Sequence, residues 1–199
     1  MKLATKRIRE RIITARVSDW PRILPVRHRG QPAGAGYGSS RFSSPSRHFK
    51  VLYAGEDFST AFAEAVVRDR FEGKQRRFLY RPYLDALCVT AISSNRELTL
   101  IDLTGAGAYE VGVDTDANQA RDHRRGQEFS ELLHGQMPDL DGILFDSRLT
   151  SARCVAIYER ALPSLTGSIP VSLLQAAELI PELNRLDIAV RRERGFELS

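Results

Sequence analysis

Four side chains of types that suit ligand binding and charge stabilisation follow one another along the sequence. Arg41 stands in a Gly- and Ser-rich stretch, Tyr53 ends a short apolar run, and Glu64 lies between two alanines. Ser147 comes much later, directly after another apolar run and an aspartate. A guanidinium can bind a phosphate or a carboxylate through paired hydrogen bonds, and a fixed carboxylate can stabilise a developing positive charge. Side chains of these types could bind an anionic ligand and stabilise a positive charge, although each of the four also has an ordinary structural explanation.

Several well-known catalytic and nucleotide-binding motifs are missing. The glycines at positions 34, 36 and 38 lack the spacing of a dinucleotide fingerprint, and no P-loop lysine follows them. No G-x-S-x-G sequence exists that would place a nucleophilic serine. The four histidines, which have neither ligand spacing nor a zinc-protease pattern, are His28, His48, His123 and His134. We therefore expect no catalytic metal, no Rossmann or Walker site and no bound cofactor.

The positive charge of the chain comes almost entirely from arginine. The formal net charge is +4 with a pI near 9.3, and 25 arginines stand against four lysines. A GC-rich genome would explain this bias without any functional meaning. An anionic phosphate ligand, an acidic protein partner or nucleic acid would explain it functionally, and the composition alone leaves these alternatives open.

Length and composition are typical of a cytoplasmic globular protein. The 199 residues suit one domain with terminal additions, and 42% of them are hydrophobic and 27% charged. Cys88 and Cys154 both stand in apolar runs, so we expect buried thiols in a reducing compartment. No stretch reaches a membrane-spanning length, and the N-terminus lacks the apolar segment of a secretion signal.

Apolar periodicity predicts short strands and helices at irregular spacing, which is typical of an α+β fold. Strands are expected at residues 49–54, 86–92, 98–103, 142–145 and 154–158. Helices are expected at 3–17, 57–70, 123–134 and, interrupted at Pro181, 171–190. Residues 30–48 are rich in Gly, Ser, Pro and Ala and are expected to form a loop.

The ordered set of motifs resembles the RES domain, a family named for its Arg, Glu and Ser. The resemblance runs from about Trp20 to Ala161 and includes the segment 100–105. Its main pieces are the segments 38–42, 51–54, 60–64 and 141–148. The resemblance implies an ADP-ribosyltransferase-like α+β fold with a mixed, mainly antiparallel β core and flanking helices. On this basis we divide the chain into a basic N-terminal helix (1–19), the RES domain (20–161) and a C-terminal helical extension packed on it (162–199).

The resemblance also implies an activity and a partner. Family members are toxins of toxin–antitoxin pairs that degrade NAD, so NAD is expected as a substrate and an Xre-type antitoxin as the partner. A homodimer within the toxin–antitoxin complex is left open. No membrane and no direct contact of this chain with nucleic acid are expected.

Position by position, Arg41 and Glu64 match the catalytic arginine and glutamate of the family. Tyr53 and Ser147 match the family residues that contact NAD, and Arg41 is expected to contact it as well. Arg22 matches an earlier NAD-binding arginine, although a proline precedes it here where the family usually has an aromatic residue. Phenylalanine follows Arg41 where many relatives carry tryptophan.

The implied chemistry suits these residue types. Cleavage of the nicotinamide–ribose bond releases neutral nicotinamide and leaves positive charge on the ribose, which Glu64 would stabilise. Arg41 and Arg22 would bind the pyrophosphate, and Tyr53 would stack on the cationic nicotinamide ring. Ser147 would hydrogen-bond the nicotinamide amide or a phosphate.

Three alternatives remain at this point. The attacking group can be water or inorganic phosphate, which gives glycohydrolase or phosphorylase activity. It can also be a protein side chain, which would make the chain a mono-ADP-ribosyltransferase. A basic nucleic-acid-binding protein without enzymatic activity is the last alternative. Glu64 also has an ordinary explanation, because Arg68 lies at i+4 and the two could form a simple helix salt bridge.

Overall fold

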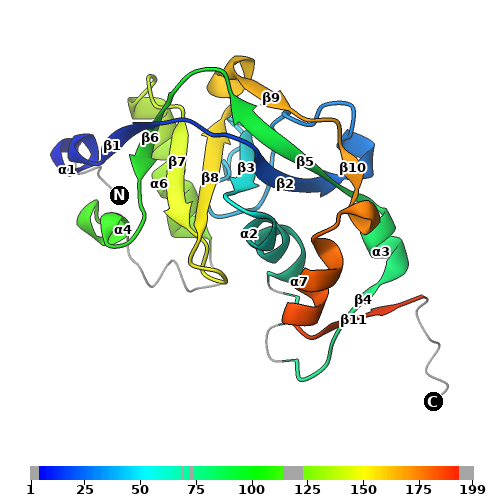
Figure 1. Ribbon diagram of the computed structural model, residues 1–199. Helices are drawn as coiled ribbons and strands as arrows, with labels where there is room; N and C mark the ends of the chain where they lie inside the picture. Colours follow the sequence, from blue (N-terminus) through cyan, green and yellow to red (C-terminus); the bar gives the residue numbers. More distant parts are fainter. Residues whose placement is uncertain (1–4, 69, 72–73, 114–122, 193–199) are drawn as a thin grey trace.

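The chain is described here from a computed structural model, in which residues 5–68, 70–71, 74–113 and 123–192 are described. A five-stranded sheet forms its centre, in the order β1-β6-β7-β8-β3 (Figure 1). Its strands are β1 (Ile12–Ala15), β3 (Val51–Gly55), β6 (Leu98–Asp102), β7 (Gly142–Asp146) and β8 (Arg153–Tyr158). Only β6 and β7 run parallel, and the other three pairs are antiparallel.

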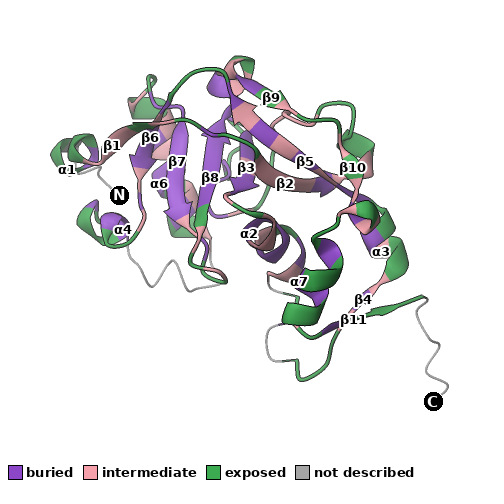
Figure 2. Ribbon diagram, in the orientation of Figure 1, coloured by how far each residue is buried: buried purple, intermediate pink, exposed green. Residues whose placement is uncertain are grey.

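Both faces of this sheet are covered, which explains the uninterrupted apolar sequences of its central strands. Along β8, Ala156 and Tyr158 belong to one buried cluster, whereas Val155 and Ile157 belong to another. Successive side chains of a strand point to opposite faces, so the two clusters lie on opposite sides of the sheet. Helix α6 (Arg124–Gln136) contributes to the first cluster and lies behind β7 and β8 in Figure 1. Figure 2 shows β7 and β8 as almost entirely buried.

A second sheet, with β5 at its centre, packs beside the first. Its strands are β2 (Trp20–Pro25), β5 (Leu87–Ser94), β9 (Leu165–Gly167) and β10 (Val171–Ser172). All of them pair with β5, and all pairs are antiparallel. Strand β5 contributes Ile92 to the cluster on the second face of the central sheet.

The remaining elements complete the edges of the molecule. Helix α2 (Phe58–Phe62) continues into a π-helical turn, η2 (Ala63–Val67), directly after β3. A two-stranded parallel ribbon of β4 (Arg77–Tyr80) and β11 (Ile188–Arg191) extends from the body, with α3 (Arg81–Asp85) and α7 (Leu179–Arg185) next to it (Figure 1). The short helices are α1 (Thr5–Glu10), α4 (Gly107–Glu110), η1 (Val26–His28), η3 (Glu159–Ser164) and η4 (Leu173–Gln175).

The α+β class and the central elements agree with the sequence-based prediction, but the two terminal segments do not. The helix predicted over 3–17 is wrong beyond Glu10, because Ile12–Ala15 forms β1 and pairs with β6. The helix predicted over 171–190 is confirmed only over Leu179–Arg185, with a short 3-10 turn at Leu173–Gln175. Its ends form β10 and β11, and Pro181 lies in the first turn of α7, where a missing N–H costs nothing.

Residues 1–4, 69, 72–73, 114–122 and 193–199, which fall within the predicted regions, lie outside the described residues. The predicted division at residues 19 and 161 stays a prediction. Both cysteines are free and buried, as predicted. In the described part of the chain, no helix combines the length and apolarity needed to cross a membrane.

Candidate functional site

A cavity of about 370 Å³ opens where β2, β3 and the π-helical turn meet. Three of the five predicted site residues line it, namely Arg22, Tyr53 and Glu64. The loop segment 36–43 contributes Tyr37, Gly38, Ser40 and Ser43 to the wall. The structure therefore brings together residues from three elements, of which the two most distant in sequence carry Arg22 and Glu64.

Local capping and a π-helical turn place Glu64 in the cavity wall. The carboxylate of Asp57 accepts a hydrogen bond from the Thr60 N–H (2.7 Å) and starts α2 immediately after β3. The helix then widens, so that the Arg68 N–H donates to the Ala63 carbonyl five residues earlier (2.8 Å). Such single π turns occur often at functional sites. Here the turn carries Glu64 and ends at Arg68.

Both oxygens of the Glu64 carboxylate are held by neighbouring side chains. The Ser147 hydroxyl donates to Oε1 (2.8 Å), and Arg68 donates to Oε2 (3.0 Å). The Glu64 and Arg68 side chains are 19% and 14% exposed. The carboxylate is thus a fixed negative charge at the surface of a cavity, which is the arrangement that can stabilise a cation formed there.

Ser147 lies behind Glu64 and does not line the cavity. It is buried, its hydroxyl oxygen accepts the Leu149 N–H (3.2 Å), and its proton goes to Glu64. The sequence predicted a direct contact between Ser147 and the ligand. In this geometry the hydroxyl orients the carboxylate.

Tyr53 lines the cavity and also holds the Gly/Ser-rich loop. Its hydroxyl oxygen accepts the Phe42 N–H (3.0 Å), and the Ser43 hydroxyl lies 3.5 Å away. Burial raises the pKa of Tyr53 to about 12, so the phenol stays neutral at physiological pH. Tyr53 thus contributes to the cavity wall, while its hydroxyl is used inside the protein.

Arg41 is buried next to the cavity and does not form part of its wall. Its guanidinium lies 5.8 Å from the centre of the Phe42 ring and 5.6 Å from that of Phe145. Burial, with a smaller contribution from the charge of Arg68, lowers the pKa of Arg41 to about 10. Arg41 therefore stays positively charged at neutral pH, close to the Glu64–Arg68 pair.

Arg22 lines the cavity, but its guanidinium holds the loop that follows it. The Nη1 group donates to the carbonyls of Pro32 (2.8 Å) and Gly34 (2.6 Å). Burial lowers the pKa of Arg22 to about 10. The sequence predicted a ligand contact for this arginine, and the contacts in the structure are structural ones.

Two residues that the sequence did not assign to the site belong to its immediate surroundings. Arg68 was considered only as an ordinary helix partner, although its i+4 spacing was visible. His123 was considered only as a metal ligand, yet its Nε2 atom lies 2.6 Å from Nη2 of Arg68. No local pattern could have linked His123 to a helix 55 positions earlier. Among the described residues, no group of histidine, cysteine and acidic side chains could hold a metal ion.

Cys154 also lines the cavity, and its surroundings argue against a nucleophilic role. Burial raises the pKa of the Cys154 thiol, which keeps it protonated. Glu64 is therefore the side chain in this wall whose charge and fixed position suit chemistry.

Known proteins resemble this chain in sequence and in fold. The sequence profile of the RES domain matches residues 10–179. A protein of Sinorhizobium fredii (strain NBRC 101917 / NGR234) named "Probable toxin y4kH" is 36% identical over 102 residues, which cover 50% of this chain and 79% of that protein. A chain in the crystal structure of the M. tuberculosis MbcT–MbcA toxin–antitoxin complex has a similar fold, with a TM-score of 0.64 and 17% identity. This similarity covers 83% of the present chain and 89% of the other.

Proposed function

The chain belongs to the RES domain family, and we propose on this basis that it is the toxin of a toxin–antitoxin pair that cleaves the nicotinamide–ribose bond of NAD. The observation that carries the proposal is the carboxylate of Glu64, held on both oxygens at the wall of a cavity. The name of the relative from Sinorhizobium fredii supports the toxin assignment.

The proposed reaction needs one fixed negative charge and no general acid. When the bond between C1 of the ribose and the pyridinium nitrogen breaks, its electron pair goes to the ring and nicotinamide leaves neutral. Positive charge then develops on the ribose C1 and its ring oxygen, and Glu64 stabilises it. Water or inorganic phosphate forms the new bond to C1. The products are nicotinamide, a proton and either ADP-ribose or its phosphorylated form.

The other predicted residues have distinct roles in this proposal. The ring of Tyr53 would stack on the cationic nicotinamide, because the face of an aromatic ring attracts a cation. Ser147 would hold Glu64 in place. The positive charge of Arg41, which lies behind the loop, would attract the pyrophosphate. Arg22 would bind the loop carbonyls of Pro32 and Gly34 and so keep these oxygens turned away from the pyrophosphate.

The direct test is NAD turnover by the purified chain. We expect release of nicotinamide. The mass of the second product, measured with and without inorganic phosphate, shows whether water or phosphate is the acceptor. A mass increase on a protein instead of a free product would indicate ADP-ribosyl transfer. Mobility shifts of nucleic acid with a steep salt dependence, without any loss of NAD, would contradict the proposal and favour a binding protein.

The partner proposal is tested in cells. We propose that an Xre-type antitoxin inhibits the chain, since the solved structure with a similar fold is a toxin–antitoxin complex. Expression of the chain alone should deplete NAD and arrest growth, and co-expression of the antitoxin should restore both. Growth arrest at a normal NAD level would contradict the proposed activity, whatever the partner does.

A further inference from the structure

A chain of hydrogen bonds connects the Glu64 carboxylate to the Gly/Ser-rich loop through His123. His123 directly precedes α6, and its Nε2 atom lies 2.6 Å from Nη2 of Arg68. Its other ring nitrogen, Nδ1, lies 2.8 Å from the Ser39 carbonyl oxygen. Arg68 in turn donates to Glu64. The imidazole thus stands between the arginine that holds Glu64 and the loop on the rim of the cavity.

The partners of the imidazole determine where its proton lies. An arginine guanidinium only donates hydrogen bonds, so Nε2 of His123 must accept. A carbonyl oxygen only accepts, so Nδ1 must carry the hydrogen that is donated to Ser39. Both bonds exist together only in the neutral ring with its hydrogen on Nδ1. Such a ring connects a donor on one side to an acceptor on the other.

We propose that His123 is a positioning residue for the reaction, which holds Arg68 and, through it, the Glu64 carboxylate. This inference rests on the proposed function and assigns a role that the family motif does not include. An i,i+4 ion pair between two flexible side chains does not by itself fix either of them firmly. The contact with His123 gives the guanidinium a second partner beside Oε2 of Glu64, which restricts the conformations of the Arg68 side chain in the cavity wall.

The chain offers a matched control for this role. Gln127, one turn further along α6, donates to the carbonyls of Ser39 (3.2 Å) and Ser40 (3.2 Å). Gln127 therefore holds the same loop as His123, and its amide is directed to the loop carbonyls. If His123 only fixed the loop, the loss of either side chain should have the same effect.

The test compares His123→Ala, His123→Gln and Gln127→Ala in NAD turnover. His123→Ala should lower kcat about 10- to 100-fold, the range expected when a catalytic group moves by up to 1 Å, with a much smaller change in KM. His123→Gln should restore most of kcat, since an amide accepts and donates as the neutral imidazole does. Gln127→Ala should keep the kcat of the unchanged protein. Equal losses in His123→Ala and Gln127→Ala, or an unchanged kcat in His123→Ala, would overturn the proposal.

A second measurement does not depend on activity. Nitrogen-15 resonances of the histidine rings distinguish the two neutral tautomers. We expect hydrogen on Nδ1 of His123 in the unchanged protein and a shift of this signal in Arg68→Gln, and the signal is assigned from its loss in His123→Gln. Hydrogen on Nε2, or no response to Arg68→Gln, would overturn the positioning role. Absence of NAD turnover in a protein with the expected tautomer would instead refute the proposed function and leave the hydrogen-bond chain standing.

Discussion

Two carboxylates in this molecule have nearly the same partners and very different surroundings. Glu64 accepts hydrogen bonds from Ser147 (2.8 Å) and from Arg68, four residues later in the chain (3.0 Å). Glu182 on α7 accepts from Ser59 (2.7 Å) and from Arg185, three residues later (2.9 and 2.6 Å). Each is a helical glutamate held by one serine hydroxyl from another segment and one arginine from its own.

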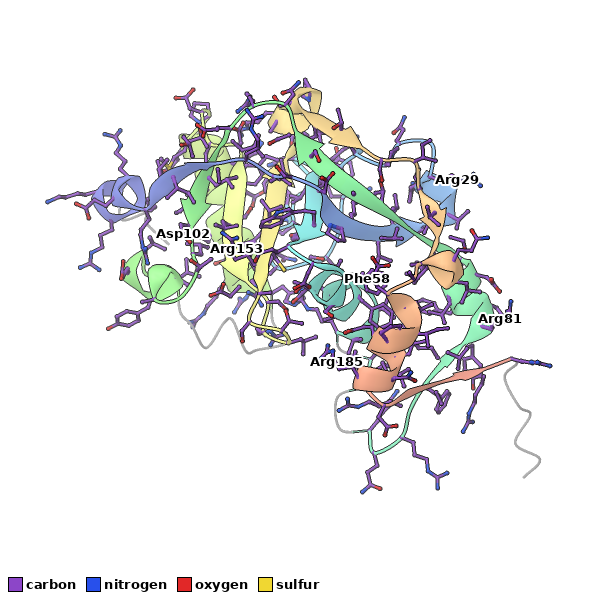
Figure 3. The ribbon with its side chains drawn as sticks, in the orientation of Figure 1. Arg29, Phe58, Arg81, Asp102, Arg153 and Arg185 are labelled. Carbon is purple, nitrogen blue, oxygen red and sulfur yellow. The ribbon has the colours of Figure 1, made fainter. Side chains whose placement is uncertain are left out.

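The two sites differ in the exposure of the arginine and in the presence of a cavity. The Glu182 side chain is 5% exposed and Arg185 is 53% exposed, whereas both Glu64 and Arg68 are partly buried at a cavity. Figure 3 labels Arg185 on α7, beside α2 and its first residue Phe58. Glu182 thus fastens α7 to α2, with its arginine turned to the solvent. A glutamate with a serine and an arginine is therefore not in itself a sign of catalysis, and the cavity makes the difference.

The largest expected effect comes from removing the two negative charges separately. Glu64→Gln should lower kcat for NAD cleavage about 10²- to 10³-fold with little change in KM, because the lost charge acts on the transition state. Glu182→Gln should keep both constants. Steady-state nicotinamide release by the two variants, at equal folded concentration, measures the contrast.

Either of two results would break this comparison. A fully active Glu64→Gln protein would show that the cavity carboxylate is a structural one like Glu182. Equal losses in both variants, accompanied by equal drops in thermal stability, would show that the rate follows folding and not the site.

A smaller contrast is expected between the two serines. Ser147→Ala leaves Glu64 with Arg68 alone, so the carboxylate should lose its orientation, and kcat should fall about tenfold, the loss expected from a partial misplacement. Ser59→Ala removes the equivalent bond to Glu182 and should affect only the stability, by about 1 kcal/mol. Kinetics and chemical unfolding of both variants separate the two outcomes. A change in KM alone in Ser147→Ala would favour the direct ligand contact that the sequence suggested.

The central strands and the main helix could be predicted because burial on both faces leaves a continuous apolar pattern. The segments Gly142–Asp146 and Arg153–Tyr158 show this pattern clearly. The strand Trp20–Pro25 was not predicted, since it contains two prolines and an arginine. Its described partner is β5 alone, so a missing N–H is tolerated at the other edge. The helix prediction failed at Ile12–Ala15 for a related reason. Only the pairing of this segment with β6 makes it a strand, and that pairing is not visible in the local sequence.

The resemblance named five candidate residues, and the structure brings three of them to one cavity, but the contacts of these residues could not be predicted. The family motif named Glu64 and Ser147, but their hydrogen bond joins positions 83 apart, and no local spacing shows it. The resemblance, together with their residue type, predicted that Arg22 and Arg41 bind a pyrophosphate. Type alone does not reveal that loop carbonyls already occupy one guanidinium and that two phenylalanine rings enclose the other.

The smallest expected effect concerns the pH dependence of the structural carboxylate. The hydrogen bonds from Arg185 hold the pKa of Glu182 below its ordinary value in the folded protein. The stabilisation is therefore complete above the unfolded pKa of about 4.3 and disappears as the pH falls through the folded pKa. Glu182→Gln should be less stable than the unchanged protein by about 1 kcal/mol at pH 7, a modest value because Arg185 is half exposed. Denaturant unfolding at pH 7, 5, 4 and 3 should show this difference shrinking below about pH 4.5. Titration of all other groups is common to both proteins and cancels. A difference that stays constant down to pH 3 would mean that Glu182 contributes by packing and not by charge, and the electrostatic likeness between the two glutamates would then be lost.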